Sequence, residues 1–110
     1  MPDLDVSELF EQMLVATKGV FAERWPNIKD FAESELDKLA RTLAQIGKLI
    51  ATDQITKGEA SVLLEMQKNT ARSVMLTLEG LGLLLVEEAL SAALNVVRDT
   101  VNTVLGFSLI

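Results

Sequence analysis

The fold depends on how the protein accommodates residues 80–86, Gly-Leu-Gly-Leu-Leu-Leu-Val. This stretch carries no charge, and residues 71–110 contain only six charged side chains against twenty in residues 1–70. Soluble proteins rarely expose a large contiguous apolar surface. Residues 80–86 must therefore be covered by the rest of the chain, by another subunit or by lipid.

The composition predicts an all-α protein. Of the 110 residues, 49% are hydrophobic, helix-forming residues predominate, and only two prolines and six glycines interrupt them. A chain of this length without a linker-like segment is expected to form one domain, residues 1–110. The mean hydropathy of +0.30 is high for a small domain. The chain therefore contains more apolar side chain than one small core comfortably covers.

Cysteine and histidine are both absent. Their absence excludes disulfides, thiolate catalysis, imidazole metal ligands and the usual Ser-His and Cys-His nucleophile pairs. The pattern Gly80-x-Gly82 is not a phosphate-binding loop, because no strand precedes it, further glycines are missing and no Lys-Ser/Thr follows. We therefore expect no enzymatic activity, no catalytic residue, no metal or cofactor site and no small-molecule substrate.

The charge of the chain disfavours several classes of partner. Binding nucleic acid requires clustered Lys and Arg, whereas this chain has a net charge of −6, a pI near 4.5 and ten dispersed basic residues. The same acidity weakens attraction to an anionic membrane surface. Residues 1–5 lack the basic and apolar regions of a signal peptide, so the expected location is cytoplasmic.

The first predicted helix spans residues 6–24. Asp5 is a suitable N-cap with Glu8 three positions later, and apolar residues then recur at spacings of three and four. Trp25-Pro26 ends this helix, because proline is tolerated in the first turn of a helix but not in its interior. The second predicted helix, residues 26–51, carries a heptad seam typical of bundles and coiled coils. The seam consists of Ala32, Leu36, Leu39, Leu43, Ile46 and Ile50.

A turn around residues 52–56 separates the second helix from a third helical region. Thr56 and Glu59 have the spacing of a capping box, in which two side chains satisfy free backbone N–H groups at a helix N-terminus. Because the connection is short, the two flanking helices should be antiparallel neighbours. Helical periodicity then continues over residues 57–105, and Gly106 is placed to stop it.

Residues 57–105 would form a straight helix of about 73 Å, too long for a compact domain of this size. At about 100° per residue, the polar stripe of its second half is rotated by roughly 130° from that of the first half, so the halves must bury different sides. Either Gly80 and Gly82 break the helix to give a four-helix bundle, or they form a hinge in one long helix that packs on other subunits. We favour the continuous or kinked helix, because Ser, Thr, Asp and Asn are missing from this segment and a turn would place Leu81 at its tip.

This interpretation predicts a non-enzymatic helical homo-oligomer that serves as a structural or protein-interaction module. Its subunit interface would lie on the apolar C-terminal helix, since that helix carries the apolar surface that one hairpin cannot cover. The candidate interface residues are Leu83, Leu90, Leu94, Val97, Val101 and Phe107.

Two alternatives to the oligomer stay open. A membrane-active protein could insert residues 74–97, although Glu79 and Glu87 interrupt this segment and charges within a membrane helix are costly. A carrier could hold a small apolar ligand inside the bundle, with Glu79 or Arg72 binding its polar head group. Carboxylates in apolar surroundings can also bind hard cations. Glu79, Glu87 and Glu88 fit more simply as members of solvated polar stripes.

Overall fold

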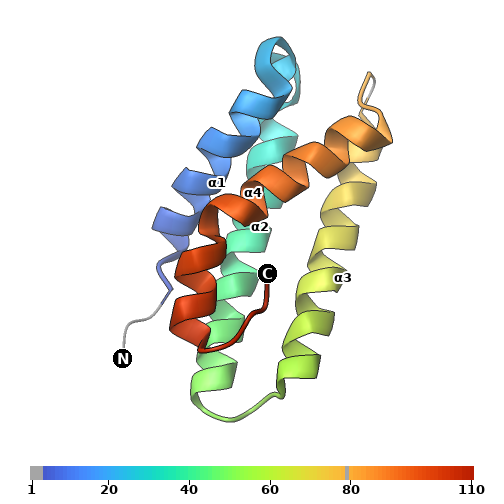
Figure 1. The fold of residues 1–110 in the computed structure, drawn as a ribbon. Coiled ribbons are helices and arrows are strands. Elements are labelled where there is room, and N and C mark those ends of the chain that lie inside the picture. The colour runs from blue at the N-terminus through green and yellow to red at the C-terminus, as the bar shows by residue number, and fades with distance from the viewer. Residues whose placement is uncertain (1–3, 79) are drawn as a thin grey trace.

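The protein is a helical bundle (Figure 1). The computed structural model describes residues 4–78 and 80–110, and these residues form helices and connections without any β-strand. The all-α prediction is therefore confirmed. The elements are α1 (Val6–Phe21), a short 3-10 helix η1 (Ala22–Arg24), α2 (Trp25–Ala51), α3 (Lys57–Leu76) and α4 (Leu83–Leu105).

Helix α1 begins at the N-cap predicted from the sequence. The Asp5 carboxylate accepts hydrogen bonds from the backbone N–H groups two and three positions later, at 2.9 and 3.3 Å. The helix ends at Phe21, three residues before its predicted end, because Ala22 adopts a positive φ of 50°. Helix α2 then begins at Trp25, with Pro26 in its first turn, where a proline ring is compatible with helical geometry.

The α2–α3 hairpin follows the predicted local signals. The Thr56 hydroxyl accepts a hydrogen bond from the backbone N–H of Glu59 (3.1 Å), and the Glu59 carboxylate accepts one from the backbone N–H of Thr56 (3.0 Å). This confirms the capping box. The two helices lie side by side and antiparallel (Figure 1), and the heptad seam of α2 lies in the core from Ala32 to Ile46.

The helical region 57–105 is broken. Helix α3 ends at Leu76 and α4 begins at Leu83, so the preference for a continuous or kinked helix is wrong and the four-helix alternative is confirmed. The physical reason lies in Leu81, which was expected at the exposed tip of any turn. Its side chain instead folds into the core and is only 8% exposed. Burial of this side chain stabilises a turn for which the local sequence provides no capping side chain.

Both glycines of the expected hinge lie in the connection between α3 and α4. Gly80 has a φ of +85°, a conformation that side chains with a Cβ rarely adopt, and its carbonyl accepts a hydrogen bond from the Arg24 guanidinium. Gly82 is the N-cap of α4, in extended conformation and without a capping side chain. The Arg24 contact ties this connection to η1 at the same end of the bundle. Hinge motion at these glycines stays a prediction.

The helices pair across the bundle in an order that differs from the order of the chain. Helix α4 packs most extensively on α1, and α3 packs most extensively on α2, whereas α3 and α4 touch less. Figure 1 shows α4 crossing obliquely from the top of α3 towards the start of α1. The molecule measures 42 × 22 × 19 Å. One core is thus built from the apolar sides of all four helices.

The chain after α4 folds back on that helix. Gly106 ends the helix with a φ of +82°, as the sequence predicted. The Asn102 side-chain carbonyl accepts hydrogen bonds from the backbone N–H groups of Leu109 (2.9 Å) and Ile110 (3.1 Å). The apolar tail is therefore held against the bundle by one amide side chain.

Candidate interaction surface

Most residues of the sequence-predicted interface lie inside the bundle. Leu90, Leu94, Val97 and Val101 are each 6% exposed or less. Leu83 is exposed at the start of α4, and Phe107 is half-buried below the ammonium group of Lys57, 5.4 Å from the ring centroid. The four buried residues cannot form a subunit contact while the bundle is folded. The prediction that they form the interface is corrected on this point.

The rotated polar stripes explain this placement. Helix α3 buries Leu64, Ala71 and Met75, whereas α4 buries a set that includes Val86 and Leu90. The break between the helices lets each segment turn its own apolar side towards the same core. A second subunit is therefore not needed to cover these two sets.

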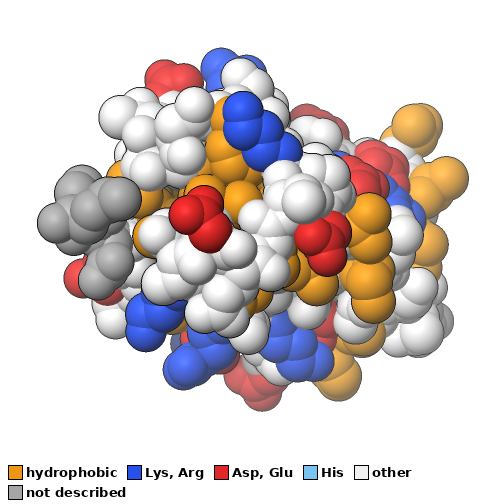
Figure 2. All heavy atoms as spheres, turned by 90° about the horizontal axis from the view of Figure 1, so that it is seen from below, with side chains coloured by type: hydrophobic (Ala, Val, Ile, Leu, Met, Phe, Trp, Pro, Cys, Tyr) orange, Lys and Arg blue, Asp and Glu red, His pale blue; other side chains and the backbone are white. Residues whose placement is uncertain are grey.

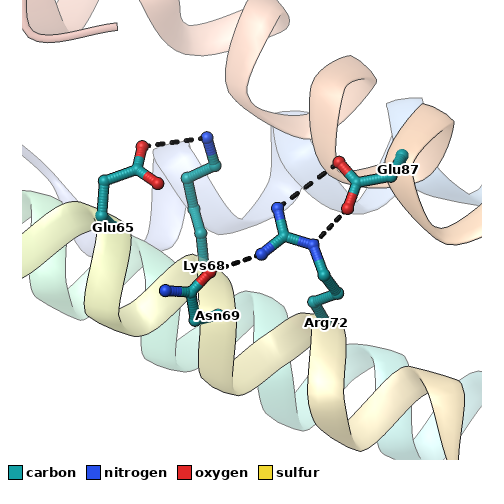
Figure 3. A network of polar contacts seen from close by, with 5 residues as sticks. All are labelled: Glu65, Lys68, Asn69, Arg72 and Glu87. Carbon is teal, nitrogen blue, oxygen red and sulfur yellow. Dashed lines mark hydrogen bonds and ion pairs between the residues drawn. The ribbon is translucent and has the colours of Figure 1, made fainter. Parts of the chain in front are cut away.

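Glu87, one of the three carboxylates considered for chemistry, forms an ion pair between α3 and α4 (Figure 3). Arg72 Nε donates to one Glu87 oxygen and Arg72 Nη2 to the other, at 3.4 Å for the second contact. The hydrogen bond from Arg72 holds the pKa of Glu87 below its usual value, and the bond to Glu87 raises the pKa of Arg72. Glu88 is exposed, and Glu79 lies outside the described residues. The structure thus gives Glu87 a role in joining two helices.

Glu35 is a buried carboxylate that sequence reasoning missed. Its residue is only 5% exposed, one carboxylate oxygen lies 3.0 Å from Lys38 Nζ, and the other has no hydrogen-bond partner among residues 4–78 and 80–110. The spacing of Ala32, Glu35 and Leu39 places all three on the core side of α2, and this spacing could have identified Glu35. Glu35 borders a small cavity in the core.

That cavity has a volume of about 20 Å³ and is lined by residues from all four helices. Three small side chains, Ala32, Ala71 and Ala89, contribute to its walls, along with the hydroxyl-bearing Thr17. A space of this size admits about one water molecule. The cavity therefore provides no room for an organic ligand in this conformation.

A stretch of uncharged, exposed helix surface lies on α3. We call it the α3 outer face and define it by Val62, Leu63, Met66, Thr70 and Ser73, all of which are exposed. The members recur at spacings of three and four, so they share one side of the helix. In Figure 2, hydrophobic side chains emerge at the right, which is the side on which α3 and the start of α4 lie in Figure 1.

A groove runs beside the α3 outer face, between α3 and α2. Its volume is about 300 Å³, and its walls include Thr42 and Leu49 of α2 together with Leu63 and Met66 of α3. The Gln67 side-chain nitrogen is buried in this wall without a hydrogen-bond partner in the described part of the chain.

A second apolar depression lies between α1 and α4. Val15, Ala16 and Val96 line it, but Glu11 stands at the same place. A carboxylate beside an apolar surface must be desolvated when a partner covers that surface, which is costly. No charged residue lines the groove beside the α3 outer face, so this face is the better candidate for a contact.

Comparisons with protein families, with curated proteins and with solved structures yield no match to this chain. No helix in the described part of the chain combines the length and apolar character needed to cross a membrane. Within residues 4–78 and 80–110, no three acidic side chains gather into a group that could hold a metal ion.

Proposed function

We propose that this chain is a non-enzymatic helical module that self-associates through apolar surface left uncovered by its own core. The observation that carries the proposal is the exposure of Val62, Leu63 and Met66 within five residues of α3, beside the α2–α3 groove. The exposure of these side chains to water is unfavourable, and a subunit that covers them recovers free energy in proportion to the apolar area buried. The role would be structural or in protein–protein interaction.

This proposal retains the homo-oligomer predicted from the sequence but moves its interface. The apolar side of α4 belongs to the core of each subunit, so the contact must use other residues. The non-enzymatic character rests on the absence of histidine and cysteine. A cytoplasmic location is part of the proposal.

The dimensions of the interior weigh against a carrier of an apolar ligand. Pockets for organic ligands typically enclose about 300–1,000 Å³, many times the volume of the core cavity. Arg72, which was considered as an anchor for a ligand head group, binds Glu87 and does not line that cavity. Membrane insertion of residues 74–97 would require Leu90, Leu94 and Val97 to leave the core.

Sedimentation in plain buffer tests the proposal, at protein concentrations from about 1 to 100 μM, the range of moderate affinities. We expect a mass of two or more times that of the 12.0 kDa chain. A single-chain mass over the whole range would refute self-association. Flotation with lipid vesicles completes the test, since a single-chain species that floats with the vesicles would favour the membrane-active alternative instead.

A further inference from the structure

Two copies of this chain repel each other unless they meet where charge is sparse, because each carries a net charge of −6. The charged residues in the middle of α3 point towards the side of α4 (Figure 3). Arg72 binds Glu87 there, and Lys68 lies 3.2 Å from Glu65. From Val62 to Ser73, the α3 outer face is left without a charged residue.

An interface between identical subunits related by a two-fold axis must be complementary to itself. A neutral apolar face meets this condition, whereas a face of one charge does not. Building on the self-association proposed above, we infer that a second copy of this chain packs its α3 outer face against that of the first copy, with the two α3 helices antiparallel.

The antiparallel direction follows from the position of Glu59. This residue precedes Leu63 by four positions and is therefore the charged end of the same helix side. In a parallel pair in register, the two Glu59 carboxylates face each other. In an antiparallel pair whose axis passes between Leu63 and Met66, they are separated by about 16 Å along the helices, at 1.5 Å per residue. The apolar residues still overlap at the axis.

The groove between α2 and α3 supplies the shape for this contact. Methionine is flexible and fills irregular spaces, so Met66 of one copy can enter the groove of about 300 Å³ on the other. Leu49 and Leu63, which line the groove, then gain apolar neighbours. The contact is thus a pairing of two α2–α3 hairpins.

The substitution Met66→Glu tests the location of the interface. Met66 is 60% exposed in the single chain, so the variant should fold with an unchanged circular dichroism spectrum and should dissociate. We expect the dissociation constant to rise at least about tenfold, because the contact would bury an unpaired charge. Leu84→Glu is the matched control, since Leu84 is also exposed but lies on α4. Val62→Lys provides a second disruption of the α3 outer face if Met66→Glu does not fold.

A single spin label tests the direction of the helices. The chain has no cysteine, so Ser73→Cys creates one labelling site at an exposed position. The antiparallel arrangement separates the two labels by about 25 Å along the helices. A parallel pair in register would place them about 10 Å apart, the spacing of packed helices.

The outcomes separate this inference from the proposed function. An assembled wild type, a dissociated Met66→Glu variant, an assembled Leu84→Glu variant and a long label distance support the inference. An assembled Met66→Glu variant, or a label distance of about 10 Å, overturns it while self-association still holds. A monomeric wild type overturns both.

Discussion

The substitution Leu94→Ala separates a core position from an interface position on α4. Leu94 is 4% exposed within the single chain, whereas Leu84 on the same helix is 86% exposed. Truncating a buried leucine typically costs about 2–5 kcal/mol of unfolding free energy, through lost transfer free energy and the cavity left behind. Surface substitutions usually stay within about 0.5 kcal/mol. The small gain in helix propensity from alanine is common to both variants and cancels in the comparison.

For a chain of 110 residues, a loss of about 3 kcal/mol corresponds to a Tm lower by about 12 °C. We expect this shift for Leu94→Ala and almost none for Leu84→Ala, measured by urea and thermal unfolding. The difference between the variants should be the same at low and high protein concentration, because the lost contacts lie within one chain. Equal stability of the two variants would refute the burial of the α4 apolar side. A difference that appears only at high concentration, where subunits assemble, would return Leu94 to a subunit interface.

Further substitutions test the helix ends, the ion pair and the connection between α3 and α4. Thr56→Ala should lower the unfolding free energy by about 1 kcal/mol, and an unchanged urea midpoint would contradict the capping box. Because Arg72 lowers the pKa of Glu87, the pair stabilises the fold above about pH 4.3, the ordinary pKa of glutamate, and loses this effect as pH falls through the lowered folded-state pKa. Glu87→Gln should therefore reduce stability at pH 7, by at most about 1 kcal/mol for this partly exposed pair, and much less at pH 2; the same loss at both pH values would contradict the ion pair. Gly80→Ala should destabilise by about 1–2 kcal/mol because of its positive φ. Gly19→Ala, within α1 and with open space around it, should stabilise by up to about 1 kcal/mol, and a stabilising Gly80→Ala or a clearly destabilising Gly19→Ala would be inconsistent with the structure.

The hairpin of α2 and α3 could be predicted from the sequence because its signals are local. Thr56 and Glu59 are three residues apart, and the seam from Ala32 to Ile46 repeats within one helix. Such patterns depend on residues that are close along the chain, so they can be recognised without knowledge of the tertiary structure. The N-cap at Asp5 is of the same kind.

The break before α4 could not be predicted in the same way, because its cause is non-local. Gly82 begins a helix without a capping side chain, and the turn is stabilised by burial of Leu81 and by the Arg24 contact to Gly80. The Arg24 contact joins residues that are 56 positions apart in the sequence. The rotation between the polar stripes was a sign of the break, but it was attributed to a second subunit.

The α3 outer face was also missed by sequence reasoning. Val62, Leu63 and Met66 continue the helical periodicity of α3, and periodicity alone does not tell which of two neighbouring stripes faces the core. Packing against α2 resolves this, since Ala60, Leu64 and Ala71 are the residues that are buried. Glu35 was missed because charged residues are rarely buried, although its spacing places it on the core side of α2.

Because α1 packs mainly on α4, part of the apolar side of α1 stays uncovered until α4 has been synthesised. The α2–α3 hairpin is local and can form as soon as it emerges, whereas the apolar side of α1 has its principal partner about sixty residues later. At translation rates of about 5–20 residues per second, α1 waits roughly 3–12 s for α4. During this interval Leu9 and Met13, which are buried in the finished bundle, remain accessible to chaperones. The nascent chain is therefore most exposed to misassembly in the seconds before its last helix arrives.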